Sequence, residues 1–125
     1  MQKEYKLISK RKLINKIYFS EIGDFMAFVK VAKIKELKPG QAKEVEANGI
    51  MIALYNVEGR LYATSNTCLH ESGSLGEGTL ENNIITCPLH GWKYDVTTGF
   101  HIMMPHMKLK TFKVKVEKED IMVDV

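Results

Sequence analysis

Two cysteine–histidine pairs constrain this chain more strongly than any other feature of its sequence. Cys68-Leu69-His70 follows one strand-like run and Cys87-Pro88-Leu89-His90 follows another, and the 125 residues include only 2 cysteines. One disulfide between them would leave the neighbouring histidines unexplained, whereas thiolate and imidazole groups are common metal ligands. The fold therefore has to bring two loops together, each with one cysteine and one histidine.

The mixed composition of each pair distinguishes between two kinds of metal site. Zinc-finger ligands more often come as a Cys–Cys pair and a His–His pair, whereas each pair here contains one of each. Two mixed loops can hold a binuclear iron–sulfur cluster from opposite sides, so that each loop gives one ligand to each iron. Glycines near the ligands, such as Gly73, would let the backbone approach the sulfides. A [2Fe–2S] cluster is the favoured interpretation, and a structural zinc site is the alternative.

From Phe28 onward the sequence predicts short strands joined by turns. Some runs alternate between polar and apolar residues, and one, Ile50–Tyr55, is almost continuously apolar, which is typical of a buried strand. Many short strands and no convincing long helix favour an all-β, antiparallel sandwich or barrel. The predicted strands include Phe28–Ile34, Ile50–Tyr55, Arg60–Ala63, Ile84–Thr86, Lys110–Val116 and Ile121–Val125.

The first 25 residues differ from the remainder in charge and pattern. Residues 1–25 carry six basic and three acidic side chains, whereas residues 26–125 carry twelve of each. Apolar positions between Leu7 and Phe19 have near-helical spacing, so we expect a basic N-terminal extension that is helical or disordered. Translation could also start at Met26. Because residues 26–125 have no basic surplus, nucleic acid is not an expected partner.

The sequence gives no sign of membrane insertion or export. No apolar run approaches the roughly 18 residues of a transmembrane helix, and the start does not resemble a secretory signal peptide. We therefore expect a cytoplasmic protein without a membrane span. A monomer is the expected state.

The spacing of the two pairs resembles that of the Rieske family. The pattern is C-x-H, a spacer of residues 71–86, and then C-P-x-H-G. Asp95–Gly99 is similar to the family's turn after the second ligand loop, and Lys110–Val125 resembles its closing hairpin. The resemblance implies a Rieske-type β-sandwich over residues 26–125, with a small cluster-binding subdomain of two ligand loops. It implies one [2Fe–2S] cluster held by Cys68, His70, Cys87 and His90.

Departures from the high-potential members of the family are also informative. Those proteins carry an extra, disulfide-bonded cysteine in each ligand loop, and the matching residues here are Gly73 and Leu89. They also have a serine two residues after the second histidine, where this chain has Trp92. Tyr94 occupies a position from which a tyrosine hydroxyl can reach a ligand cysteine. The resemblance therefore implies a soluble, low-potential type, toward the low end of the roughly −150 to +300 mV Rieske range.

Residues around the ligands divide into those that tune the cluster and those that contact a partner. Trp92 is expected to pack against a ligand loop, while His101 and His106 do not fit the ligand spacing and are assigned surface or supporting roles. The residues expected to surround or tune the cluster are Gly91, Trp92, Tyr94 and Pro105. The candidate partner contacts are Glu71, Met103 and Met104, with Met107 close by.

The sequence contains no nucleophile–base pair, no paired catalytic carboxylates and no phosphate-binding glycine loop. The resemblance therefore implies an electron carrier that is not itself an enzyme. It would pass single electrons from a reductase to a terminal oxygenase or a similar enzyme. The alternative is a Rieske-like small subunit of a larger oxidoreductase, such as an assimilatory nitrite reductase.

Overall fold

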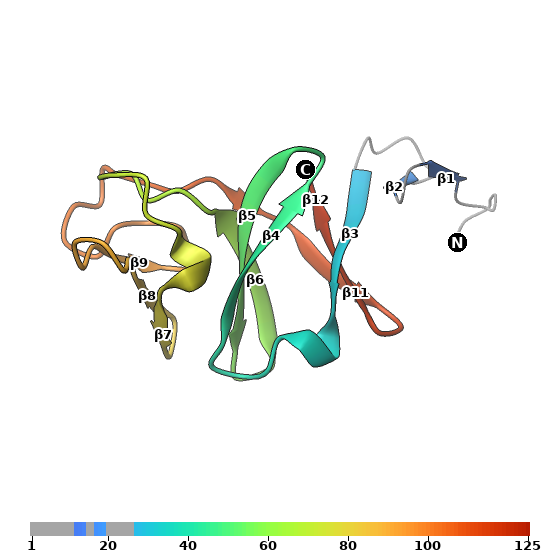
Figure 1. The fold of residues 1–125 in the computed structure, drawn as a ribbon, viewed down its shortest axis with the longest axis horizontal. Coiled ribbons are helices and arrows are strands. Elements are labelled where there is room, and N and C mark those ends of the chain that lie inside the picture. Colours follow the sequence, from blue (N-terminus) through green and yellow to red (C-terminus); the bar gives the residue numbers. More distant parts are fainter. Residues whose placement is uncertain (1–11, 15–16, 20–26) are drawn as a thin grey trace.

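The computed structural model describes residues 12–14, 17–19 and 27–125, which form three antiparallel sheets (Figure 1). The described residues contain no α-helix, only two 3₁₀ turns, η1 (Ile34–Glu36) and η2 (Leu75–Glu77). The predicted all-β, antiparallel fold is therefore confirmed. In chain order the strands are β1 (Lys12–Ile14), β2 (Ile17–Phe19), β3 (Ala27–Lys33), β4 (Ala42–Ala47), β5 (Ile50–Val57), β6 (Arg60–Ser65), β7 (Thr79–Glu81), β8 (Ile84–Thr86), β9 (Lys93–Asp95), β10 (Thr111–Phe112), β11 (Val114–Glu117) and β12 (Asp120–Asp124).

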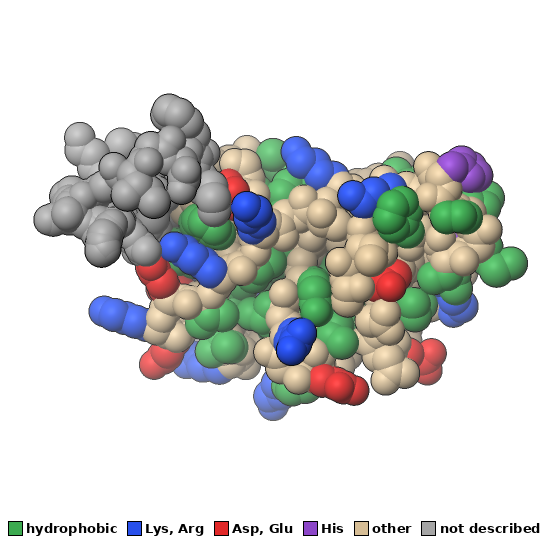
Figure 2. Space-filling view, turned by 180° about the vertical axis from the view of Figure 1, so that it is seen from behind, with side chains coloured by type: hydrophobic (Ala, Val, Ile, Leu, Met, Phe, Trp, Pro, Cys, Tyr) green, Lys and Arg blue, Asp and Glu red, His purple; other side chains and the backbone are tan. Residues whose placement is uncertain are grey.

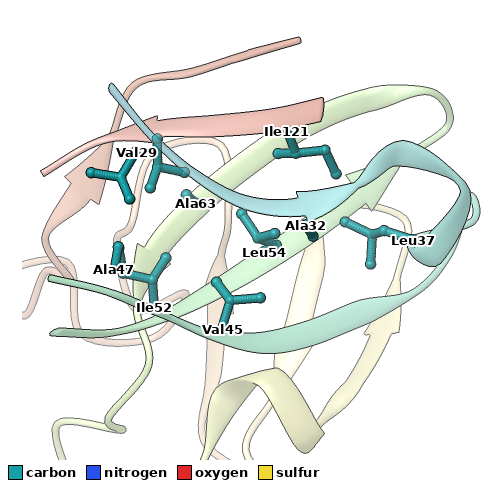
Figure 3. Packing of buried hydrophobic residues seen from close by; sticks show 10 residues of the cluster. Val29, Ala32, Leu37, Val45, Ala47, Ile52, Leu54, Ala63 and Ile121 are labelled. Atoms are coloured by element: carbon teal, nitrogen blue, oxygen red, sulfur yellow. The ribbon is translucent and has the colours of Figure 1, made fainter. Parts of the chain in front are cut away.

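Two of the sheets pack face to face and enclose the first of two cores. The strand order is β1-β2-β3-β12-β11 in one sheet and β10-β6-β5-β4 in the other. Figure 3 shows Val29 and Ile121 from the first sheet directed toward Leu54 and Ile52 from the second. Alternating apolar side chains on both inner faces form this core because successive residues of a strand point to opposite sides.

From Ile52 to Tyr55, strand β5 is buried on both faces, as predicted, whereas Ile50 and Met51 at its start are exposed. Ile52 and Leu54 point into the core between the two large sheets. Ala53 and Tyr55 point the other way, into a second core shared with the ligand loops. All four side chains are fully buried. This part of β5 therefore separates the two cores and contributes side chains to both.

The third sheet, β7-β8-β9, forms the small subdomain with the loops around it. Ile85 in β8 and Tyr94 in β9 are fully buried and face the second core, while their neighbours along each strand are more exposed. The two ligand loops leave β6 and β8, and β9 follows the second of them. This arrangement places both loops at the end of the molecule that carries β7–β9 (Figure 1).

The N-terminal segment differs from its expected form where the structure describes it. Residues 12–14 and 17–19 form a pair of strands rather than a helix, and β2 pairs with β3 through Ile17–Val29 and Phe19–Ala27. Pairing with β2 satisfies backbone groups at the edge of β3, and tertiary pairing of this kind overrides a local helical pattern. The other residues of the extension lie outside the described part. Figure 1 shows β1 and β2 at the end of the molecule opposite β7–β9.

Across the described residues, the structure contains no helix with the length and apolar character that crossing a membrane would require.

Candidate metal centre

Backbone hydrogen bonds hold each ligand loop closed. In the first loop, Cys68 N donates to the carbonyl of Gly73 at 3.0 Å. In the second, Cys87 N donates to the carbonyl of Trp92 at 2.7 Å, and Gly91 N donates back to the carbonyl of Cys87 at 3.1 Å. Gly91 has φ +77°, a conformation that glycine adopts without strain. The main chain therefore fixes where the cysteine of each loop lies.

The two cysteines lie together in the interior. Cys68 and Cys87 are 3% and 2% exposed, neither forms a disulfide, and each thiol affects the pKa of the other. Space beside them is tight, since a Cβ atom on Gly73 would lie 2.5 Å from Cys87 Sγ and 3.3 Å from Leu89 Cγ. Residues 73 and 89, where high-potential proteins carry their extra cysteines, are thus adjacent here without a bridge.

The two histidines lie side by side at the surface. The ring centroids of His70 and His90 are 4.9 Å apart, with the rings inclined at 71°. His90 Nε2 is 2.8 Å from Glu71 Oε1, so Nδ1 is the ring nitrogen of His90 left for another partner. The hydrogen bond from His90, together with its positive charge when protonated, lowers the pKa of Glu71. Glu71 thus contacts a candidate ligand, and its role as a partner contact stays a prediction.

Tyr94 connects β9 to the first ligand loop through its hydroxyl group. The oxygen accepts a hydrogen bond from Leu69 N at 3.1 Å and lies 3.4 Å from Cys68 Sγ. Because the oxygen already accepts from Leu69, its proton is free to be donated to sulfur. Burial raises the pKa of the Cys68 thiol, but hydrogen bonds, first that from Tyr94, bring it below its ordinary value. Burial also raises the pKa of Tyr94, so the hydroxyl stays protonated.

Trp92 covers one of the candidate ligands. Its ring stacks on His70 with a centroid distance of 4.5 Å and an interplanar angle of 9°. The same tryptophan is only partly buried. Trp92 therefore packs against His70 of the first ligand loop, which is the kind of contact predicted for it.

The segment after β9 brings further predicted residues beside the ligand loops. A hollow next to the second loop is lined by Gly91, Trp92, Lys93, His101, Ile102, Met103 and Met104. Met103 is 79% exposed, and Pro105 lies in the turn that Met107 N closes with the carbonyl of Met104 at 2.9 Å. Figure 2 shows hydrophobic side chains and a histidine gathered at the end of the molecule away from the N-terminal segment. Met103 and Met104 thus share a surface with Trp92.

His101 is the residue whose importance the sequence did not reveal. It is 5% exposed, and its ring lies perpendicular to those of Trp92 and Tyr94 at 4.7 and 5.2 Å. The structure excludes the surface role for His101 and leaves the supporting one, whereas His106 is exposed. The burial of His101 could not be predicted from the sequence, because apolar residues do not recur at regular spacing in residues 96–110.

The candidate ligands form a thiol pair and an imidazole pair rather than one convergent group. In the described part of the chain, no three side chains of His, Cys, Asp or Glu are arranged to hold a single metal ion. A mononuclear zinc site requires its ligands to meet around one point. A donor set of two thiols and two imidazoles, grouped in kind, fits the two irons of a [2Fe–2S] cluster instead.

The chain matches a family model and characterised relatives over most of its length. Residues 27–113 match the Rieske [2Fe–2S] domain. The ferredoxin component of the naphthalene 1,2-dioxygenase/salicylate 5-hydroxylase systems of a Ralstonia species is 39% identical over 77% of this chain and 93% of that protein. The biphenyl 2,3-dioxygenase ferredoxin component of Rhodococcus jostii (strain RHA1) is 38% identical, over 80% of this chain and 94% of that protein.

Solved structures agree with these sequence matches. The ferredoxin of carbazole 1,9a-dioxygenase from Nocardioides aromaticivorans IC177 has a TM-score of 0.72 and 29% identity, covering 78% of this chain and 96% of that one. A chain from the complex of reduced oxygenase and oxidised ferredoxin in carbazole 1,9a-dioxygenase has a TM-score of 0.71 and 35% identity, covering 78% and 92%. The protein therefore belongs to the Rieske [2Fe–2S] family and, within it, is a Rieske-type ferredoxin.

Proposed function

We propose that this protein carries single electrons on one [2Fe–2S] cluster, with Cys68 and Cys87 on one iron and His70 and His90 on the other. The observation that supports this assignment most directly is the pairing of donors in kind, with buried thiols behind and exposed imidazoles in front. Such a cluster, when bound, takes up and releases one electron at a potential set by its ligands and surroundings.

The residues around the candidate ligands have distinct tasks in this proposal. Burial of the two cysteines keeps water from the sulfur side, while the exposed histidines shorten the path to a redox partner. Glu71 orients His90 through Nε2, so that Nδ1 faces the cluster. Tyr94 donates a hydrogen bond to Cys68 Sγ, which stabilises the more negative reduced state. No side chain in this set performs chemistry on a substrate.

We further propose that the protein receives electrons from a reductase and delivers them to a terminal oxygenase. The relatives that match over most of this chain are ferredoxin components of dioxygenase systems, and one related ferredoxin is known in complex with its oxygenase. These matches favour a separate carrier over the small subunit of a larger oxidoreductase. The two unbridged cysteines agree with a reducing compartment, and we propose the cytoplasm.

Metal analysis and spectroscopy of the purified holoprotein test the cluster assignment. We expect two irons and two acid-labile sulfides per chain, a coloured oxidised form, and an electron paramagnetic resonance (EPR) signal after one-electron reduction. Replacing a ligand, as in His70→Ala or Cys87→Ala, should abolish that signal. His106→Asn, in an exposed histidine away from the site, should retain it. One zinc per chain and a colourless protein would contradict the proposal.

A further inference from the structure

His101 links three parts of the molecule that the candidate ligands depend on. Its Nδ1 accepts hydrogen bonds from Met103 N at 3.0 Å and from Met104 N at 3.1 Å. Its ring meets the rings of Trp92 and Tyr94 at nearly right angles. Its backbone continues this connection, because His101 forms an isolated bridge with Tyr94.

The two bonds to Nδ1 follow a pattern that usually belongs to other residues. A side-chain acceptor that receives the N–H groups two and three positions ahead is characteristic of Asn, Asp, Ser and Thr at turns and helix starts. His101 makes the same pair of hydrogen bonds and so fixes Met103 and Met104, which begin the turn that contains Pro105. Because Nδ1 accepts, the neutral ring carries its proton on Nε2.

The unpaired nitrogen argues that this histidine does more than fill space. His101 Nε2 is buried and has no hydrogen-bond partner in the described structure. A buried donor without a partner lowers stability, and phenylalanine would occupy similar volume without that cost. Burial, and then the charge of His106, lower the pKa of His101, in agreement with a neutral ring.

Both aromatic neighbours of His101 support candidate ligands. Trp92 stacks on His70, and Tyr94 contacts Cys68 Sγ and Leu69 N. If His101 were displaced, Trp92 and Tyr94 would both be free to move, and the contacts to the His70 imidazole and the Cys68 thiol would weaken together.

We propose that His101 is a positioning residue with two separable roles: Nδ1 anchors the turn at Met103 and Met104, and the ring holds Trp92 and Tyr94 against His70 and Cys68. The first role stands on the hydrogen bonds alone. The second rests on the proposed function, since it concerns the environment of the cluster.

Two substitutions separate the roles. His101→Asn keeps an acceptor at the same distance from the backbone, because Asn Oδ1 can accept from both amides, but it removes the ring. His101→Phe keeps a ring but removes the acceptor. His106→Asn is the matched control, since His106 lies in the same segment and is exposed.

Each role has its own measurement. Amide hydrogen exchange at residues 103–104 reports on the anchored turn, and the EPR spectrum and reduction potential report on the surroundings of the cluster. We expect His101→Phe to exchange about tenfold faster at Met103 and Met104, as expected when a hydrogen bond is lost, with EPR and potential close to wild type. His101→Asn should retain slow exchange, but broaden or shift the EPR signal and change the potential. The control should match wild type in both measurements.

Three outcomes would overturn the proposal. If the amides of Met103 and Met104 in wild type exchanged as fast as in an unstructured peptide, the anchoring role would be contradicted. This outcome can be measured even if neither variant folds. Unchanged EPR and potential in His101→Asn would remove the second role, and equal loss of both properties in both variants would reduce His101 to core packing. Absence of two irons from wild type would instead contradict the proposed function, and the exchange test of the anchor would still apply.

Discussion

At the scale of single residues, the hydroxyl group of Tyr94 provides a direct means of changing the potential. The hydrogen bond to Cys68 Sγ favours the reduced state, so Tyr94→Phe should lower the potential. If the bond contributes about 1 kcal/mol, the decrease is on the order of 50 mV for one electron. Redox titration checks it, with Tyr62→Phe, the same change at a half-buried tyrosine of β6, as the control. An unchanged or higher potential would contradict this role.

His101 makes the stability of the protein depend on pH. Burial lowers its pKa below the ordinary value of 6.5. The unfolded chain therefore binds a proton more readily than the folded one, so this contribution to stability is complete above pH 6.5 and is lost as the pH falls through the lowered value. Thermal unfolding of His101→Phe should change less between pH 7.5 and 5.5 than that of wild type. A slope equal to that of wild type would contradict the assignment.

The outcome for single residues shows what sequence can and cannot supply at this scale. The Cys and His types and their spacing predicted the four candidate ligands, because metal chemistry restricts those residue types severely. The sequence did not indicate that the Glu71 carboxylate lies 2.8 Å from His90 Nε2. Contacts between side chains of different loops depend on how the loops are placed in space, and spacing along the chain does not contain that information.

At the scale of secondary-structure elements, the first ligand loop depends on the absence of a side chain at Gly73. A methyl group there would lie 2.5 Å from Cys87 Sγ, which is closer than a Cβ atom can approach, and Gly73 is buried. We expect Gly73→Ala to bind less than the full complement of iron and to lose about 1–3 kcal/mol of stability, as is usual for overpacking. Iron analysis and thermal unfolding measure both. Ser72→Ala, an exposed neighbour, is the control, and full iron binding by Gly73→Ala would contradict the predicted collision.

The strands themselves were predictable where side-chain alternation or a turn was strong. The predicted strands Ile50–Tyr55 and Arg60–Ala63 form a hairpin that turns at Glu58 and Gly59, and glycine adopts the positive φ of +95° found there. Strand β9 was not predicted, because it has only three residues and pairs with β8 across the second ligand loop. Strands β1 and β2 were missed because near-helical spacing over a short segment is a weaker signal than pairing with β3.

At the scale of the whole molecule, the N-terminal strands and the ligand loops lie at opposite ends (Figure 1). Removal of residues 1–25 should therefore leave iron content and the EPR spectrum unchanged. Loss of β2 exposes the edge of β3, so we expect a decrease of about 1–2 kcal/mol in stability from the lost hydrogen bonds. Metal analysis and thermal unfolding of the truncated protein check both results. Loss of iron would show that the two ends are coupled.

The division of the chain at residue 26 and the low potential both stay predictions at this scale. The family match begins at residue 27, where β3 also begins, but β2 continues the same sheet across the boundary. The potential depends on hydrogen bonds and solvent near the cluster, of which the structure supplies the Tyr94 contact and the exposed histidines.

The two-sided burial of β5 has a consequence for protein engineering. Its even-numbered residues Ile52 and Leu54 belong to one core, and the odd-numbered Ala53 and Tyr55 belong to the core behind the ligand loops. If the ligand loops and β7–β9 were transferred into another scaffold, the two ligand loops alone would not be enough. The transferred segment would have to include β5, whose Ala53 and Tyr55 pack behind the ligand loops. The recipient protein would then need an apolar surface that packs against Ile52 and Leu54 on the opposite face of the strand.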